Sequence, residues 1–194
     1  MTRLDLLRHG EPVGGPRYRG QIDDPLSERG WAEMRGAVAG EDWDVLVSSP
    51  LVRCRAFAEA LARERGLPLE IEHRFREIGF GAWEGRTAAE LRAEDAQALS
   101  RFYADPVAHR PPGAEPVAEF LARIAAGLDD CLQRHAGRRA LVVGHAGVIR
   151  AALVHLLEAP APSLFRIKVP SAGLTRIEAD GERPPMLIFH GRRP

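Results

Sequence analysis

Two short apolar runs, each leading into a histidine, most constrain the fold of this chain. The run at 4–7 precedes Arg8 and His9, and the run at 140–143 precedes Gly144 and His145. Short runs of this kind, bounded by polar and glycine residues, predict buried strands. Because open α/β sheets bind ligands at the carboxyl ends of their strands, both histidines are expected at one edge of a sheet.

Strand and helix patterns alternate along the rest of the chain. Apolar residues recur at helical spacing after Ser27, and a last helix is predicted from about Gly147 to Leu157. The other runs that predict strands are Val45–Val47, Leu69–Ile71, Phe165–Val169, Leu174–Ile177 and Met186–Phe189. Strands separated by helices predict an α/β fold, a three-layer α/β/α sandwich with a mostly parallel central sheet.

Several helix ends are marked by their residue types. Ser49 is expected as an N-cap, with Pro50 as the first helical residue, and Gly66 is expected to end that helix. The segment 87–90, Thr-Ala-Ala-Glu, is a capping box. It is predicted to open one helix that carries the apolar residues of 91–102.

Composition limits the class of protein. With 194 residues, 45% of them hydrophobic, residues 1–194 are expected to form a single domain. The 27 basic and 27 acidic residues balance, so the chain is not expected to bind nucleic acid or a membrane surface. Cys54 and Cys131 lack metal-ligand spacing and are expected to be buried thiols. Neither a signal peptide nor a membrane-spanning run is visible, so a cytoplasmic protein is expected.

Polar residues at the predicted strand ends point to an anion. Arg8 and His9 follow one strand, His145 follows another, and Arg53 lies in the first turn of the helix after a third. All basic residues except Lys168 and the histidines are arginines, and guanidinium groups bind phosphate with two parallel hydrogen bonds. Helix N-termini also attract phosphate. The sequence therefore predicts a phosphoryl site.

Five segments in order resemble the histidine phosphatase superfamily, the phosphoglycerate mutase-like enzymes. The matching segments are Leu7–Glu11, Asp24–Ser27, Ser48–Cys54, Glu77–Gly85 and Gly144–Arg150. One such motif alone would be weak evidence, whereas five in the order of the superfamily are specific. The resemblance implies a phosphoglycerate mutase-like fold and phosphoryl transfer without a metal or other cofactor.

The resemblance also implies a role for each residue of the predicted site. His9 would be the nucleophile, with Arg8 and Arg53 holding the phosphoryl oxygens and His145 as a further hydrogen-bond donor. The two arginines also disfavour protonation of His9, which keeps its lone pair available. Glu77 would act as general acid for the leaving oxygen and then as general base for water.

The loop after His9 departs from the pattern of the superfamily. Pro12 and Gly15 stand where many members carry a hydroxylated residue and an asparagine that binds phosphate. Arg19 or Gln21 is expected to replace that ligand. Ala146, which follows the second histidine, completes the predicted substrate-binding residues.

Other interpretations stay open at this point. Glu84 and Glu11 are alternatives to Glu77 as general acid. A metallohydrolase built on His9, His145 and Glu77 and a non-catalytic protein that binds phosphorylated ligands are the rival classes. No nucleoside-triphosphate loop of the form GxxxxGK[ST] is present.

Within the superfamily, the α-ribazole phosphatases of cobalamin assembly show the closest resemblance. The segments that carry it are Leu4–Glu11, Arg19-Gly20, Trp43–Arg55, Phe80–Gly85 and Pro111–Val117. The implied substrate is α-ribazole 5′-phosphate, a small-molecule phosphomonoester. Broad-specificity hydrolysis of sugar phosphates or nucleotides and mutase-type transfer are the alternatives, although the chain is too short for the mutase insertion. Residues 86–116 are expected to form a cap-like insertion, and a homodimer is compatible with the sequence.

Overall fold

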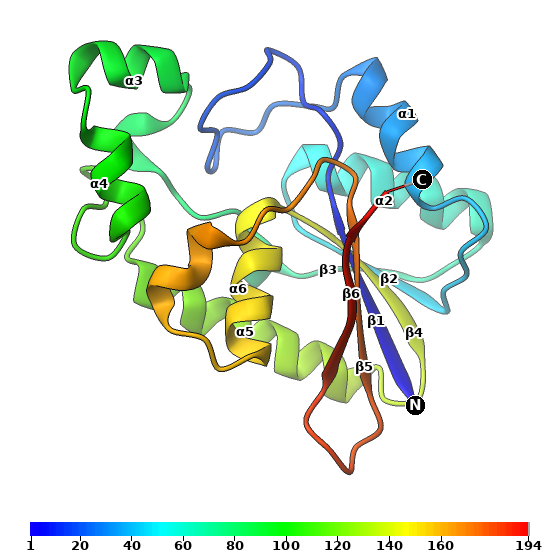
Figure 1. The fold of residues 1–194 in the computed structure, drawn as a ribbon. Coiled ribbons are helices and arrows are strands. Elements are labelled where there is room, and N and C mark those ends of the chain that lie inside the picture. Colours follow the sequence, from blue (N-terminus) through cyan, green and yellow to red (C-terminus); the bar gives the residue numbers. More distant parts are fainter. Residues whose placement is uncertain (194) are drawn as a thin grey trace.

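The centre of the protein is a six-stranded β-sheet, seen in a computed structural model that describes residues 1–193. In chain order the strands are β1 (Thr2–Arg8), β2 (Val45–Ser48), β3 (Leu69–Ile71), β4 (Arg139–Gly144), β5 (Leu174–Ala179) and β6 (Met186–Arg192). Their order across the sheet is β3-β2-β4-β1-β5-β6 (Figure 1). The first four are mutually parallel, and β5 and β6 are antiparallel additions. The mostly parallel sheet predicted from the sequence is confirmed.

Helices cover both faces of the sheet. The covering helices are α1 (Glu28–Ala37) and α2 (Val52–Arg65) on one face, and α5 (Val117–Arg134) and α6 (Ala146–Leu156) on the other (Figure 1). Leu4 and Leu6 of β1 pack in the apolar cluster that contains α5 and α6, whereas Leu7 packs with α1 and α2. Side chains of a strand alternate between the two faces, so one strand contributes to both cores. The α/β/α sandwich is therefore confirmed.

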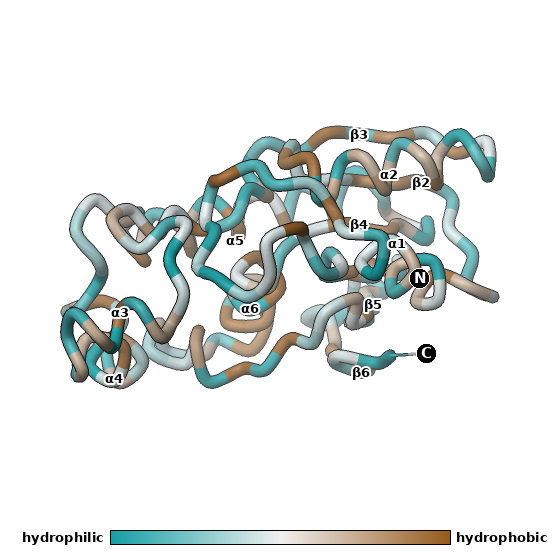
Figure 2. The backbone as a smooth tube through the Cα atoms, turned by 90° about the horizontal axis from the view of Figure 1, so that it is seen from above, coloured by the Kyte–Doolittle hydropathy of each residue, from teal (hydrophilic) through white to brown (hydrophobic). Residues whose placement is uncertain are grey.

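Two short helices, α3 (Ala88–Glu94) and α4 (Ala98–Ala104), lie at one end of the molecule. Figure 2 shows them beside the sheet rather than over it. Trp83, Leu91 and Phe102 belong to an apolar cluster of their own in this region. The segment is thus held together partly by contacts that neither main core supplies.

Most predicted helix ends are confirmed. The Ser27 hydroxyl accepts a hydrogen bond from the Gly30 N–H and caps α1, and Gly66 ends α2 in the left-handed conformation. Thr87 and Glu90 form the predicted capping box at the start of α3. Among the described residues, no helix is both long and apolar enough to cross a membrane.

Two helix predictions were wrong. α2 begins at Val52 with Leu51 as its N-cap. The Ser49 hydroxyl lies 2.7 Å from His145 Nε2 and accepts a hydrogen bond from the Leu51 N–H, so it bonds the cap residue and not an N–H group within α2. The single helix expected after the capping box is divided into α3 and α4. It breaks at Asp95, whose carboxylate accepts a hydrogen bond from the Gln97 N–H and so competes with helix continuation.

The strand predicted at Phe165–Val169 was also wrong. The chain instead forms a 3₁₀ helix, η3 (Ala161–Arg166), followed by an irregular segment. The carbonyl oxygens of Ile167 and Val169, which a strand would use for its ladder, accept hydrogen bonds from the side chains of Arg150 and Arg8. Arginine side chains therefore donate the hydrogen bonds that a neighbouring strand would otherwise donate to these carbonyl oxygens.

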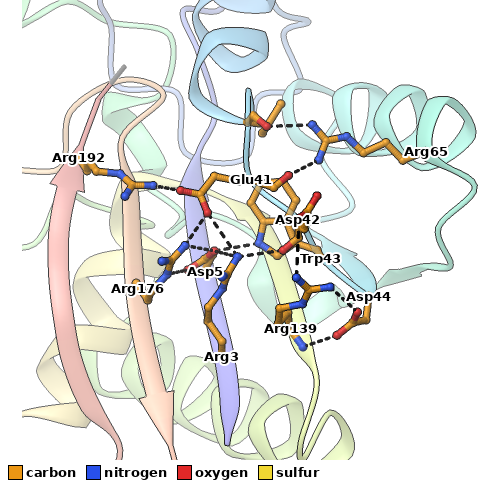
Figure 3. A network of polar contacts seen from close by, with 11 residues as sticks. Arg3, Asp5, Glu41, Asp42, Trp43, Asp44, Arg65, Arg139, Arg176 and Arg192 are labelled. Atoms are coloured by element: carbon orange, nitrogen blue, oxygen red, sulfur yellow. Dashed lines mark hydrogen bonds and ion pairs between the residues drawn. The ribbon is translucent and has the colours of Figure 1, made fainter.

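A buried ion network ties β1 to β5, β6 and the segment before β2 (Figure 3). Asp5 is fully buried and accepts hydrogen bonds from Trp43 Nε1 at 2.9 Å and from Arg176 Nε at 2.8 Å. Glu41 pairs with three arginines, Arg3, Arg176 and Arg192. We call this group the Asp5–Glu41 network. Each of its two carboxylates contacts more than one guanidinium group, and three arginines share the two negative charges.

Candidate active site

The carboxyl ends of three parallel strands meet at one edge of the sheet. Arg8 at the end of β1 lies opposite Gly144 at the end of β4, and Ser48 of β2 lies opposite Val143. His9, Ser49 and His145 directly follow these strand ends, so the sheet register brings them together. This edge is the one that the sequence predicts to carry the site.

His9 is buried, with 7% of its surface exposed. Its Nδ1 lies 2.7 Å from the carbonyl oxygen of Gly10. A carbonyl only accepts, so Nδ1 carries the proton and donates it to that bond, which leaves a lone pair on Nε2. Burial, followed by the charges of Arg53 and Arg8, places the pKa of His9 well below its usual range. The imidazole is therefore neutral and nucleophilic.

The loop after His9 is pressed against α1. A Cβ added to Gly10 would lie 2.2 Å from the Gly30 carbonyl oxygen, and a Cβ added to Gly30 would lie 2.1 Å from the Glu11 carbonyl oxygen. Only glycine fits at either position, because backbone atoms occupy the space a side chain needs. The two glycines let the nucleophile loop contact the helix directly.

Arg8 and Arg53 are held by backbone carbonyls rather than by carboxylates. Arg8 Nη1 donates to the Val169 carbonyl oxygen at 2.6 Å. Arg53 donates from Nη1 to Ile22 and from Nη2 to Gly20, at 2.7 and 2.8 Å. Within residues 1–193 neither guanidinium forms an ion pair with a side chain at salt-bridge distance. Both cations keep charge available for an anion.

Glu77 lies in the wall of the same cavity and is 9% exposed. Its Oε2 accepts a hydrogen bond from the Gly147 N–H at 3.1 Å, and its Oε1 accepts one from the Ile78 N–H at 3.0 Å. A Cβ at Gly147 would lie 2.1 Å from Oε1, so the glycine makes room for this carboxylate. Glu77 is fixed from two sides.

The two alternative acids lie elsewhere. Glu84 Oε1 accepts hydrogen bonds from the Phe80 and Gln21 N–H groups and so joins two loops. Glu11 has a half-exposed side chain that pairs with Arg29. Neither is among the residues that line the cavity. The geometry thus favours Glu77.

His145 is fully buried beside His9. Its ring centroid lies 5.2 Å from that of His9 in an edge-to-face arrangement. Its Nε2 lies 2.7 Å from the Ser49 hydroxyl, and Cys54 Sγ lies 3.6 Å from the same nitrogen. Burial and the charge of Arg53 place the pKa of His145 well below its usual range. The Ser49 contact was missed because Ser49 was assigned to a helix cap.

The cavity at this edge has a volume of about 200 Å³. The predicted residues in its wall are Arg8, His9, Arg19, Arg53, Glu77 and Ala146. Further side chains in the wall include Arg17, Tyr18, Phe80, Tyr103, Arg150 and Phe165. His145 and Gln21 are not in the wall. Sequence reasoning gave Arg150 no role, although it follows Gly147 by three residues and so shares its helix face.

Arg19, expected to replace a missing phosphate ligand, is tied to its own loop. Its Nε donates to Asp24 at 3.0 Å, and its Nη2 donates to the carbonyls of Val13 and Gly15. The guanidinium closes the loop that lacks the asparagine. No three His, Cys, Asp or Glu side chains within residues 1–193 are grouped to hold a metal ion.

Together these groups suit attack on a phosphoryl group. A neutral imidazole offers a lone pair, two unpaired guanidinium groups can hold anionic oxygens, and a carboxyl group stands in the same cavity. Attack on a phosphoryl group requires fixed groups that stabilise charge and that transfer a proton. The guanidinium groups and the carboxyl group can do so here.

Comparisons with known proteins agree with this geometry. The chain is 35% identical to the bifunctional protein Rv2228c of Mycobacterium tuberculosis over 96% of its own length and 53% of that protein, so it spans about half of that relative. It superposes on the alpha-ribazole phosphatase of Shigella flexneri with a TM-score of 0.84 and 26% identity, covering 98% and 96% of the two chains. The mycobacterial glucosyl-3-phosphoglycerate phosphatase Rv2419c gives a TM-score of 0.86 and 28% identity, covering 97% and 98%.

The match to a protein family is wider than any of the motifs described above. It covers residues 4–190, which include most of β1, the cavity residues, α3 and α4, and the first part of β6. The similarity to the two phosphatases and the match to this family together support the assignment of the chain to a phosphatase family. The chain belongs to the histidine phosphatase superfamily, branch 1.

Proposed function

We propose that the protein hydrolyses phosphomonoesters through a phosphohistidine intermediate on His9. The observation that carries this proposal is the Nδ1 contact to the Gly10 carbonyl, which leaves the Nε2 lone pair beside two arginines that lack carboxylate partners. A neutral nucleophile next to uncompensated cations is suited to an anionic electrophile.

In the first step, His9 Nε2 attacks phosphorus and the bond to the ester oxygen breaks. The leaving oxygen takes a proton from the Glu77 carboxyl group. Arg8 and Arg53 stabilise the phosphoryl oxygens. In the second step, Glu77 as carboxylate takes a proton from water, the water oxygen bonds to phosphorus, and the N–P bond breaks. Nε2 regains its lone pair.

His145 belongs to this proposal as a donor to the phosphoryl group. Because its Nε2 is held by the Ser49 hydroxyl at 2.7 Å, donation requires that contact to be exchanged for the substrate. Ala146, the first residue of α6, brings the N–H groups of a helix N-terminus to the same wall.

The intermediate can be detected by rapid quenching with a ³²P-labelled ester. We expect an acid-labile, base-stable label on the protein, and none on the His9→Ala variant. A label that survives acid, or that persists in the variant, would rule out His9 as the nucleophile. Turnover in the presence of a chelator tests the independence from metal.

Glu77→Gln tests the general acid. We expect kcat/KM to fall by roughly 10²–10⁴ on alkyl phosphates, which need protonation of the leaving oxygen. The fall should be smaller on p-nitrophenyl phosphate, whose leaving group is stable as an anion. Equal losses on both substrates would assign the acid to another residue; Glu84→Gln is the matched control.

We propose that residues 86–116, which contain α3 and α4, form a cap that selects the substrate. Support comes from their separate apolar cluster and from Tyr103 in the cavity wall. Two substrates are candidates. The resemblance to α-ribazole phosphatases favours α-ribazole 5′-phosphate in cobalamin biosynthesis, whereas Arg150 in the cavity favours an ester with a further anionic group. Comparing kcat/KM on α-ribazole 5′-phosphate, 3-phosphoglycerate and p-nitrophenyl phosphate separates them.

A further inference from the structure

The cavity wall contains cations that the phosphoryl-transfer steps do not use, among them Arg17 and Arg150. Arg17 is exposed to solvent and donates to the Gly14 carbonyl oxygen, whereas Arg150 is half-buried. Arg150 lies on α6, three residues after Gly147, and both line the cavity. Residues three apart share a helix face, and helical side chains tilt toward the N-terminus. The N-terminus of α6 is at the catalytic edge, so the guanidinium extends back toward His9.

Arg150 is held in one orientation. Its Nε donates to the Ile167 carbonyl oxygen at 2.8 Å, and its guanidinium lies 5.5 Å from the centroid of the Phe165 ring. Within residues 1–193 its two Nη groups make no hydrogen bond, and the side chain has no ion pair. Two parallel donors therefore remain for a ligand, in the arrangement that suits a carboxylate or phosphate.

The charges around the cavity leave Arg150 without a counter-charge while substrate is bound. Arg19 is paired with Asp24. Arg8 and Arg53 flank His9 and together balance a dianionic phosphoryl group. In the proposed first step Glu77 is protonated and neutral. A half-buried cation with no anionic partner is unfavourable, so a partner on the ligand would stabilise it.

Two tyrosines complete this second part of the cavity. The hydroxyls of Tyr18 and Tyr103 lie 2.6 Å apart, and both residues line the wall with Phe165. One hydroxyl donates to the other, which leaves one O–H free to donate to a ligand. Burial and the Tyr103 contact raise the pKa of Tyr18, so Tyr18 stays uncharged and adds no anion.

We propose that Arg150 binds a second anionic group, a carboxylate or a further phosphoryl group, on the substrate molecule whose phosphate reacts at His9. The preferred substrate is then a small phosphomonoester with two anionic ends. This inference deepens the proposed phosphatase function and rests on it. Arg8, His9 and Arg150 line the same cavity, so one small molecule can contact all three.

The wild-type protein tests the inference with matched substrates. The pairs are 3-phosphoglycerate with glycerol 3-phosphate, which lacks the carboxylate, and fructose 1,6-bisphosphate with fructose 6-phosphate. We expect kcat/KM to favour the doubly anionic member by roughly ten-fold or more in at least one pair. The pair that shows the preference identifies the group. Equal kcat/KM values within both pairs would overturn the inference. So would a higher kcat/KM on α-ribazole 5′-phosphate, which has no anionic group besides the phosphate that reacts.

Variants of Arg150 then assign the preference to this side chain. Arg150→Gln should lower kcat/KM on the doubly anionic substrate by roughly 10–100-fold more than on its partner, and Arg150→Lys should retain part of the preference. Arg166→Gln, an exposed cation on η3, is the control and should leave the preference intact. Equal losses on both members of a pair would make Arg150 a structural residue.

Hydrolysis of p-nitrophenyl phosphate separates the two possible failures. If the wild type hydrolyses it but does not distinguish the members of either pair, the phosphatase proposal stands and the role of Arg150 falls. If none of these esters is hydrolysed, the phosphatase proposal itself fails.

Discussion

Two arginine-rich regions share strand β1 and use their guanidinium groups in opposite ways. Asp5 and Arg8 are three residues apart, about 10 Å along an extended strand. In the Asp5–Glu41 network, arginines from three strands meet two carboxylates (Figure 3). At the catalytic edge, Arg8 and Arg53 donate to carbonyl oxygens only. A carbonyl orients a guanidinium group without neutralising it, so the second region keeps its charge for a ligand.

The comparison separates stability from function. Removing one carboxylate from the network should leave three arginines sharing a single carboxylate and weaken the fold. Removing a charge from the catalytic edge should mainly weaken phosphoryl transfer.

The largest effect is expected for His9→Ala. Its Nε2 bonds to phosphorus in the proposed mechanism, so we expect kcat on p-nitrophenyl phosphate to fall by more than roughly 10⁴-fold. The ring has one hydrogen bond, to the adjacent Gly10 carbonyl, so the melting temperature should change little. His73→Ala, an exposed histidine outside the cavity, is the control. Substantial turnover in His9→Ala would contradict the covalent mechanism.

Arg53→Gln should show the next largest effect. Loss of one fixed donor to the transition state lowers kcat/KM by roughly 10²–10³-fold. Inhibition by inorganic phosphate should weaken in parallel, which steady-state kinetics measures. Arg55 lies on the same helix and pairs with Glu59 at the surface, so Arg55→Gln should retain wild-type values. An unchanged inhibition constant in Arg53→Gln would show that this arginine does not hold phosphate.

Asp5→Asn tests the other region. The carboxylate is fully buried between Arg3 and Arg176, so its loss should lower the free energy of unfolding by about 3 kcal/mol. Urea denaturation measures this, and kcat/KM of the folded fraction should stay at the wild-type value. Asp42→Asn, with its side chain 81% exposed, should change stability by less than about 0.5 kcal/mol. Loss of activity without loss of stability in Asp5→Asn would contradict the assignment of the Asp5–Glu41 network to stability.

The two regions should also respond to acid in different pH ranges. The pKa values of His9 and His145 are lowered by burial, so the unfolded chain takes up protons below about pH 6.5 that the folded chain does not. Stability should therefore fall below pH 6.5, by at most about 1.4 kcal/mol per pH unit for each histidine. The pKa of the buried His135 is lowered by burial as well. His9→Ala should therefore remove part of this fall, as measured by urea denaturation at pH 7.5 and 5.5.

Glu41 behaves differently. Burial raises its pKa, but hydrogen bonds from Arg176 and Arg192 outweigh burial and lower it. The contribution of Glu41 to the free energy of unfolding is thus complete above about pH 4.3 and is lost only at lower pH. If the fall in stability between pH 7.5 and 5.5 is the same in His9→Ala as in the wild type, His9 is not one of its sources.

The sequence predicted those parts of the structure that depend on local patterns. The apolar runs before His9 and His145, the helix start near Ser27 and the helix end at Gly66 need only neighbouring residues, and each was found. Parallel pairing then brought the two histidines together. The strand-end pattern selected Arg8, His9 and Arg53, which line the cavity, and His145, which does not. Glu77 was selected only by the resemblance to the superfamily.

The errors arose where distant side chains replace local partners. Val169 accepts a hydrogen bond from Arg8, 161 residues away, and the strand pattern around it gave no sign of this. Ser49 has the residue type of a helix cap, yet its hydroxyl contacts His145, 96 residues on. Arg150 looked like an ordinary helix residue because nothing near it in sequence reveals the missing anionic partner.

The close contact between Gly10 and Gly30 has a consequence for the speed of the reaction. Since backbone atoms of α1 fill the space beside the nucleophile loop, His9 has few other positions to occupy. The entropy of placing the imidazole is then lost once, when the chain folds, rather than at every turnover. Rate enhancement at His9 depends in this way on the absence of two methyl groups from the place where a loop crosses a helix.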